Sequence, residues 1–338
     1  MTAALAYPVS AQFSGIAKDA GDGVPVPMVD NLLTNAFTFV DTPVWMHDNS
    51  YIGGMDATGT DVQGKIYCAV SGGGQVFTDT LPYLLANILG DVVTTGTASP
   101  FTHAIALMNP AAANSYTAQP TTHTFTAYNG VGTTYGAWTI ASAALSQLVI
   151  QFDAAASLLT YTFTANGWPS ALALARPTSA PSAVLPIAGW RGKMGLGGPA
   201  SGGTLVANLA SAKITINREI ENEFMADGTQ NPLLISRGAI TTAFDATFLA
   251  QNVLPWTDMV TNVQPQLQWL FNVGANQSVQ LDMQLGAMEV TKPNYGSKTV
   301  RWDVSGVGVR NSTNVGASGG QGSIKATVIN TVASGHYN

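Results

Sequence analysis

Residues Ser211–Ala250 read SAKITINREIENEFMADGTQNPLLISRGAITTAFDATFLA, two runs of alternating apolar and polar residues joined by a loop. One face of the first run is apolar, with Ile214, Ile216, Ile220 and Phe224. Its other face is polar and acidic, with Thr215, Asn217, Glu219, Glu221 and Glu223. In the second run Ile240, Phe244 and Phe248 oppose Arg237, Thr241, Asp245 and Thr247. Because successive strand side chains point to opposite sides, this stretch predicts two strands with one face on a core and one in water.

The composition favours a chain that works packed against copies of itself. Only 9% of the 338 residues are charged, against about 25% in an average globular domain. A secreted β-protein can have a similar composition, so this alternative stays open here. The length allows one large core or two ordinary ones.

The charge is unevenly distributed along the chain, whose net charge is −6. Residues 1–175 contain Lys18 and Lys65 against ten acidic residues, whereas residues 176–338 contain eleven basic and nine acidic residues. No basic stripe is present, and affinity for nucleic acid comes mainly from Lys and Arg that neutralise phosphates. We therefore expect DNA, where it meets this protein, to slide past it.

No motif points to an enzyme, a cofactor or a metal site. Cys68 is the only cysteine, and the histidines lack a short ligand spacing such as HExxH. We expect His103 and His123 to make structural hydrogen bonds. The N-terminus lacks the basic start and apolar run of a signal peptide, and no apolar run approaches the ~20 residues of a membrane span, so we expect synthesis in the cytoplasm.

Two helices are predicted between the strands. Asp79–Gly90 has a candidate cap at Asp79 or Thr80, a proline in its first turn, one apolar stripe and a glycine just past its end. A weaker helix is expected at about Thr257–Phe271. Residues 168–190 contain four prolines, a density that disfavours helix and interior strand alike, and this segment is the candidate connection between domains.

An internal repeat aligns the two halves. Residues 64–70, followed by the first helix, parallel residues 238–244, followed by the second helix, at an offset of 238 − 64 = 174. Residues 145–167 parallel residues 285–308 at an offset of 285 − 145 = 140. An enlarged loop at residues 91–140, in the first half only, accounts for the difference.

These blocks resemble, in order, the tail tube proteins of long-tailed (siphovirus-type) bacteriophages, which are related in fold to type VI secretion tube proteins. LPYLLANILGDVVTTG (81–96), FTHAIALMN (101–109), LSQLVIQF (145–152) and LLTYTFTANGW (158–168) are similar to the first half of that family. GWRGKMGLGG (189–198), ASAKITINREIENEF (210–224) and GTQNPLLISRGAITTAFDATFLAQ (228–251) are similar to the second half. The resemblance covers roughly residues 60–300 and depends on the order of the blocks, not on an invariant motif.

The resemblance implies a mainly β chain of tandem β-sandwich or half-barrel domains, each with one short flanking helix. Their sheets are expected to join between subunits into a closed barrel, and the rings to stack into a hollow tail tube that conducts the genome. The implied partners are further copies of the chain, a tape-measure protein, and tail terminator and baseplate proteins. If the halves are duplicated, three chains supply the six domains of a ring; otherwise six chains are needed.

The predicted organisation has five parts. Residues 1–40 form an N-terminal arm, 41–168 a first tube domain, 169–190 the proline-rich connection, 191–308 a second tube domain, and 309–338 a glycine-rich C-terminal arm with a last strand. The two arms are expected to bridge adjacent rings. A capsid or decoration protein and a secreted carbohydrate-binding β-protein remain as alternative functions.

The candidate site residues lie on or near the opening stretch. Candidates for the lumen are Glu219, Glu221, Glu223 and Asp245, since a row of acids would repel DNA. Candidates for contacts between subunits or rings are Asp227, Gln230, Asn231, Arg218 and Arg237. Lys213, Arg218 and Arg237 are also expected to pair with acids of a neighbouring strand or subunit. The alternative interpretation of the acidic row is an ordinary solvated strand face.

Overall fold

The computed structural model describes residues 12–50, 59–109, 119–128, 136–155, 157–173, 177–178 and 181–337. In these ranges the chain is mainly β, with helices α1 (Leu81–Leu89) and α2 (Leu254–Val260). The strands of the first half are β1 (Phe13–Lys18), β2 (Asp30–Leu32), β3 (Thr34–Asp48), β4 (Thr60–Gln75), β5 (Gly90–Thr95), β6 (Phe101–Leu107), β7 (His123–Tyr128), β8 (Trp138–Asp153), β9 (Thr160–Gly167) and β10 (Ala171–Leu172). Those of the second half are β11 (Gly192–Leu196), β12 (Leu209–Glu223), β13 (Leu234–Leu249), β14 (Gln266–Gly274), β15 (Gln277–Asn294), β16 (Arg301–Gly308) and β17 (Ile324–Asn330).

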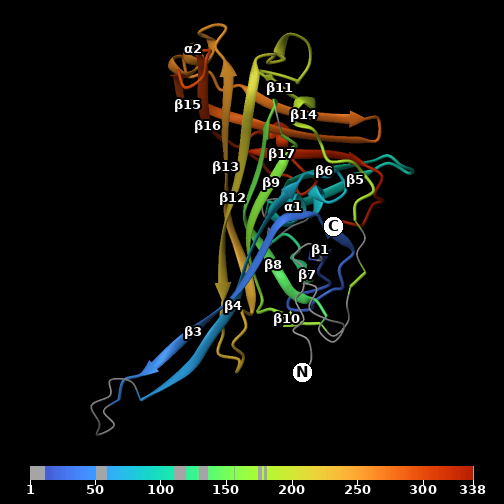
Figure 1. The fold of residues 1–338 in the computed structure, drawn as a ribbon, viewed down its shortest axis with the longest axis vertical. Helices are drawn as coiled ribbons and strands as arrows, with labels where there is room; N and C mark the ends of the chain where they lie inside the picture. Colours follow the sequence, from blue (N-terminus) through green and yellow to red (C-terminus); the bar gives the residue numbers. More distant parts are fainter. Residues whose placement is uncertain are drawn as a thin grey trace, which may run out of the picture.

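Eight antiparallel strands form one sheet that runs through both halves, which we call the large sheet. Its order is β3-β4-β9-β8-β12-β13-β16-β15, so β8 and β12 join the two halves. Burial alternates residue by residue along β12 and along most of β13. The predicted amphipathic strand pair is therefore present as β12 and β13. In Figure 1 these strands form the long axis of the molecule, and the β3–β4 hairpin extends away from the body.

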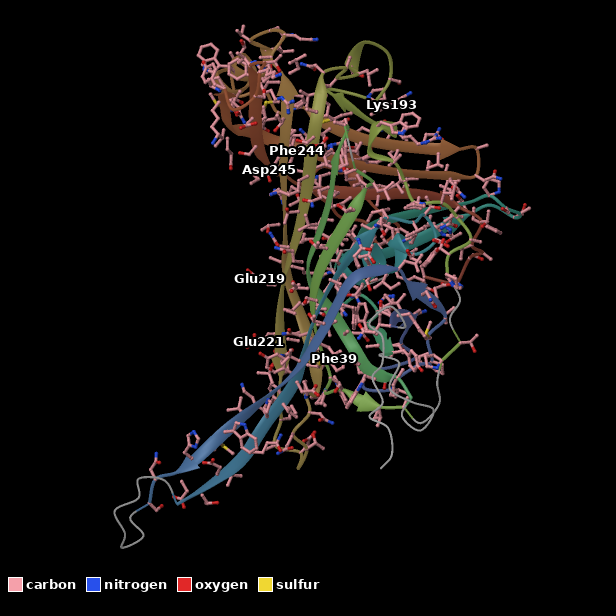
Figure 2. The ribbon with its side chains drawn as sticks, viewed as in Figure 1. Phe39, Lys193, Glu219, Glu221, Phe244 and Asp245 are labelled. Carbon is pink, nitrogen blue, oxygen red and sulfur yellow. The ribbon has the colours of Figure 1, made fainter. Side chains whose placement is uncertain are left out.

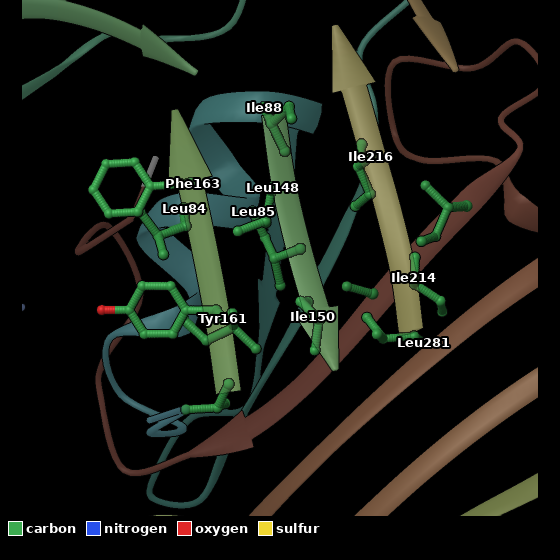
Figure 3. Close-up of a cluster of buried hydrophobic side chains, with 14 of the residues drawn as sticks. Leu84, Leu85, Ile88, Leu148, Ile150, Tyr161, Phe163, Ile214, Ile216 and Leu281 are labelled. Atoms are coloured by element: carbon green, nitrogen blue, oxygen red, sulfur yellow. The ribbon is translucent and has the colours of Figure 1, made fainter. Parts of the chain in front are cut away.

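The core lies between the large sheet, α1 and two smaller sheets. One small sheet contains β2, β1, β7, β10 and the start of β8; the other contains β11, β14, β17, β6, β5 and the start of β15. Figure 3 shows Leu85 and Ile88 of α1 beside Leu148 and Ile150 of β8. Every residue of α1 is buried, and Gly90 follows the helix with a positive φ of 99°, which glycine adopts without strain. The predicted first helix is confirmed.

The two halves share one strand-pairing scheme. In the first half the pairs are β1–β7, β3–β4, β4–β9, β7–β8, β8–β9 and β8–β10. In the second half the corresponding pairs are β11–β14, β12–β13, β13–β16, β14–β15, β15–β16 and β15–β17. The β5–β6 hairpin falls in the loop that the sequence predicts to be enlarged, and the described part of the second half has no counterpart of it.

Irregularities in the strands repeat as well. In β3–β4, Val44 opposes both Gly64 and Lys65; in β12–β13, Glu219 opposes both Gly238 and Ala239. Asn35 of β3 and Ala210 of β12 are extra residues at matching places, as are Ser146 of β8 and Glu289 of β15, each on the inserted side of a bulge. A bulge is a specific feature of a strand pair, not a random defect. Three matched bulges are what an internal duplication produces.

The prediction of the second helix needs correction. The second helix covers only Leu254–Val260, and residues 266–271 belong to strand β14, because Leu267, Trp269 and Phe271 alternate into the core with a period of two.

The described parts of the predicted arms are packed into the fold. β1 of the N-terminal segment pairs with β7, and its Ile16 is fully buried. β17 of the C-terminal segment pairs with β15 and β6, and the hydroxyl of Tyr337 donates to the carbonyl of Asp79 at 2.6 Å. Residues 1–11 of the predicted N-terminal arm lie outside the described residues. Apolar residues spaced for strands tie both segments to the core.

Candidate functional site

The side of the large sheet that faces away from the core is polar along β12 and β13, and we call this side the open face. Its central residues are Lys213, Thr215 and Asn217 of β12 and Asp245 and Thr247 of β13. Figure 2 shows Glu219, Glu221 and Asp245 on the side of β12 and β13 that points away from β5 and β6. Near Lys213 and Asp245 the face is hollowed by a shallow depression of about 940 Å³. Its walls come from both halves of the chain.

The acidic row lies on the open face. Register and alternation place Glu219, Glu221 and Glu223 on the same side of β12 as Lys213. Glu219 and Glu221 are exposed, whereas Glu223 is half-buried and accepts a hydrogen bond from the Ser236 hydroxyl at 3.1 Å. The carboxylates of Glu219 and Glu221 are therefore accessible to solvent on this face.

Asp245 is partly neutralised by Lys213. The Lys213 ammonium lies 2.8 Å from the Asp245 carboxylate, directly across the β12–β13 pair. The matching position in the first half holds a pair of hydroxyls, Thr38 and Ser71, whose oxygens are 2.7 Å apart. The predicted pairing of Lys213 with an acid of the neighbouring strand is confirmed, and it makes Asp245 a weaker source of negative potential than the three glutamates.

Arg218 and Arg237 are not placed as the sequence analysis expects. Both are buried, with 4% and 6% of their surface exposed, so they are not on a surface that a neighbouring chain could reach in this conformation. Arg218 follows the alternation of Ile214 and Ile216 onto the core side, where its Nη1 donates to the Ile88 carbonyl at 2.6 Å. Burial lowers the pKa of Arg218 to about 10.

A bulge explains the misplacement of Arg237. The extra residue at Gly238–Ala239 shifts the alternation of β13 by one, so Arg237 turns to the core side, opposite Ile220. Its Nη1 donates to the Pro120 carbonyl. Burial, together with repulsion from Arg218, lowers the pKa of Arg237 to about 9.

The Asp227–Asn231 loop joins the end of β12 to β13 and touches the neighbouring hairpin of the same chain. Gln230 donates from its side chain to the Gln63 carbonyl at 2.8 Å, and its own carbonyl accepts from the Ile66 amide at 3.0 Å. Asp227 is exposed, and hydrogen bonds from the Thr229 amide and hydroxyl lower the pKa of its carboxyl. Gln230 thus connects the β12–β13 hairpin to β4 by two hydrogen bonds, while Asp227 is accessible to solvent.

The buried histidines have structural partners. His103 is held between Thr94 at 2.8 Å and Asn330 at 2.9 Å, and His123 is hydrogen-bonded to Asn87 at 2.9 Å. The prediction of structural hydrogen bonds for both is confirmed. Within the described ranges, no group of three or more His, Cys, Asp or Glu side chains has a metal-binding arrangement, and no helix is long and apolar enough to cross a membrane.

The two outer edges of the large sheet were not anticipated from the sequence. Among the described residues, β3 pairs with β4, and the Val290–Asn294 part of β15 pairs with β16, so each leaves one edge of the large sheet unpaired. Val40 on β3 is 62% exposed, and Tyr295 just beyond β15 is 73% exposed. Only the order of the strands reveals these edges, because the sequence alone does not say which strand is outermost.

The comparisons with known proteins bear on this arrangement. The family model described as "Phage tail tube protein" matches residues 42–328. No curated protein matches the chain. The match takes in both helices and the whole of the large sheet except residues 34–41 of β3. Since the model covers well over half of the sequence, the chain belongs to the phage tail tube protein family.

Proposed function

We propose that this protein assembles into rings that stack into a hollow phage tail tube, with the open face of the large sheet lining the channel. The family makes it a structural component of the virion tail. The observation that carries the finer proposal is the large sheet itself. It has one face on the core, an open face that is polar along β12 and β13, and, among the described residues, no pairing partner at either outer edge. A sheet built in this way gains most by closing into a barrel with further copies, because closure removes the exposed edges.

The open face suits a channel for DNA. Glu219, Glu221 and Glu223 lie on the open face, and no row of basic residues lies beside them among the described residues. Lys213, a basic residue of this face, forms an ion pair with Asp245. Without clustered cations to neutralise phosphates, DNA passes without being held. The role is structural and not catalytic. A tape-measure protein inside the tube, and terminator and baseplate proteins at its ends, are the further partners that we propose.

Electron microscopy of the purified protein tests the assembly. We expect stacked rings with a central channel wide enough for duplex DNA. A protein that stays monomeric at every concentration, or that assembles into closed shells, would contradict the proposal.

Charge reversal tests the channel lining. Glu219→Lys, Glu221→Lys and Glu223→Lys, made together in the phage that carries the protein, should leave tubes intact but slow DNA ejection, because the lysines bind phosphates. The control is Asp227→Lys, an exposed acid in the loop beyond β12. Ejection that is equally fast in the triple variant and in the control would show that this face does not line the channel.

A further inference from the structure

One joint between equivalent repeats already exists inside the chain. β12, at the edge of the second repeat, pairs antiparallel with β8, at the edge of the first, over Ser211–Asn217 and Gln147–Asp153. We call this pairing the internal joint. Within it Thr215 lies opposite Val149, and Ile214 lies opposite Ile150. Ile214 and Ile150 are both fully buried, so the joint continues the core from one repeat to the next.

The matched bulges fix which residues of the outer edges correspond to those of the internal joint. β3 corresponds to β12, because Pro43 and Arg218 precede the same bulge, at an offset of 218 − 43 = 175. β15 corresponds to β8, because Gln147 and Val290 follow the same bulge, at an offset of 290 − 147 = 143. The two unpaired edges are thus the counterparts of the two strands that meet in the internal joint.

We infer that β3 of one chain pairs antiparallel with β15 of the next chain, in the register of the internal joint. Thr215 and Val149 lie opposite each other in the internal joint. By the offsets, Thr215 corresponds to Val40 (215 − 175 = 40) and Val149 corresponds to Lys292 (149 + 143 = 292). Val40 of one chain therefore lies opposite Lys292 of the next. The other pairs follow in steps of one, and Thr38 lies opposite Asn294. This inference rests on the proposed function, which it makes specific by naming the strands that join the chains.

The chemistry of the two edges fits this register on the core side. Phe37 and Phe39 of β3 come opposite Tyr295 and Pro293 of the next chain. Both Pro293 and Tyr295 are exposed in the single chain, whereas their counterparts Ile150 and Phe152 are buried by the internal joint. Phe37 and Phe39 are half-buried at the edge of the core. The pairing would therefore bury apolar surface that the single chain leaves in water.

The open-face side of the same register pairs Thr38, Val40 and Thr42 with Asn294, Lys292 and Val290, and Lys292 is its only charged residue. A slip by one residue would turn Phe37 and Phe39 toward the polar side chains of β15, since side chains alternate with a period of two. Lys292 and Pro293 are residue types that discourage indiscriminate pairing of a sheet edge.

The joint is heterologous, because different surfaces of the two chains meet. Such joints generate a ring when the rotation between subunits closes. Every chain contributes two repeats, so internal joints and β3–β15 joints alternate around the ring. For a ring of six repeats, this assigns three chains.

Cysteine cross-linking of the full chain tests the register. Val40→Cys with Lys292→Cys places two thiols directly opposite, within the separation of Cα atoms of about 4.4–6.8 Å that a disulfide needs. The matched control is Val40→Cys with Asn294→Cys, which lie diagonally on the same face, two residues out of register. The native Cys68 stays out of the reaction, because its thiol is buried and burial raises its pKa to about 12. The assembled protein is oxidised and then separated on a denaturing, non-reducing gel.

The expected result is loss of the single-chain band in the Val40–Lys292 variant, with linked species that end at three chains, and little linkage in the control. Rings or tubes seen by microscopy without this linkage, or with equal linkage in the control, would overturn the β3–β15 joint while leaving the tube intact. Linked chains that form no rings or tubes would support the joint and count against the proposed function. A protein that neither links nor assembles would contradict both.

Discussion

Leu81-Pro82-Tyr83 opens α1 and Leu254-Pro255-Trp256 opens α2, at the same place in the two halves of the chain. Leu81 is 1% exposed and Leu254 is 54% exposed, and Tyr83 and Trp256 differ in the same way, at 1% and 48%. The difference comes from what covers each helix. α1 packs against β5, β6 and β8, whereas α2 packs mainly against β15. The helix of the first half is thus buried in the core, whereas the helix of the second half exposes apolar side chains at the surface.

The tips of the long hairpins differ as well. On β3 the open-face positions are Val44 and Met46, and on β12 the matching positions are Glu219 and Glu221. Val44 and Met46 are exposed apolar residues, so the first hairpin offers an apolar surface where the second offers charge. The same backbone therefore carries two different surfaces. The strand pairings are thus the same in the two halves, whereas the side chains at matching positions differ.

The largest expected effect separates the two helices. Leu81→Ala should lower the free energy of unfolding by about 2–5 kcal/mol, because it leaves a cavity in the core. The matched variant Leu254→Ala should lower it by less than about 1 kcal/mol, because that side chain is already half in water. Urea unfolding of the unassembled chain measures both. Equal losses would mean that α2 is buried as deeply as α1 in solution.

A smaller loss of stability is expected at acid pH, and it comes from His123 in the first half of the chain. Burial, with smaller contributions from the charges of Arg237 and Lys18, lowers the pKa of His123 to about 3. The unfolded chain takes up this proton near pH 6.5, and the folded chain does not until about pH 3. Stability should therefore be fully present above pH 6.5 and fall as the pH drops toward 3, by up to about 1.4 kcal/mol per pH unit from this group.

The acid prediction is checked by unfolding His123→Gln between pH 7 and pH 4. The variant starts less stable, having lost the hydrogen bond to Asn87, but its stability should depend less on pH than that of the original chain. His47→Gln is the control, since His47 is exposed on the β3–β4 hairpin. An unchanged slope in His123→Gln would assign the acid sensitivity to other groups.

The smallest effect is expected on the open face. Lys213→Thr with Asp245→Ser gives the second half the uncharged pair of the first half, Thr38 and Ser71. Both charged side chains are nearly half exposed, and such ion pairs contribute about 0–1 kcal/mol. The double variant should therefore unfold within about 1 kcal/mol of the original, and the difference should shrink in high salt. A loss of several kcal/mol would show that the pair is not interchangeable between the halves.

The sequence predicts the strand pair β12–β13 and helix α1 because their signals are local. Alternation with a period of two and an apolar stripe between proline and glycine can each be read within a short window. The repeat was also visible, since Gly64 and Gly238 occupy the same bulge in the two halves. The open-face acids follow from the alternation alone.

Other features escaped prediction because they depend on distant parts of the chain. The bulge that turns Arg237 toward the core adds a single residue to β13, and the spacing of the apolar residues in the sequence does not indicate it. The segments predicted to be arms contain few apolar residues, yet Ile16 and Tyr337 are buried against parts of the fold that are distant in sequence. The second helix is shorter than predicted, because Leu267, Trp269 and Phe271 alternate into the core with the period of a strand. Which strands are outermost is a property of the sheet order.

The pairing of β8 with β12 also bears on how assembly depends on protein concentration. Two strands carried by one chain meet at an effective concentration set by their connection, of the order of millimolar for short flexible linkers. Strands on separate chains meet only at the concentration of the protein itself. In the proposed ring, every second joint is thus present before any two molecules collide. Synthesis of one chain delivers two repeats in fixed order and equal amounts, and the ring needs half as many joints between separate molecules as one built from single repeats.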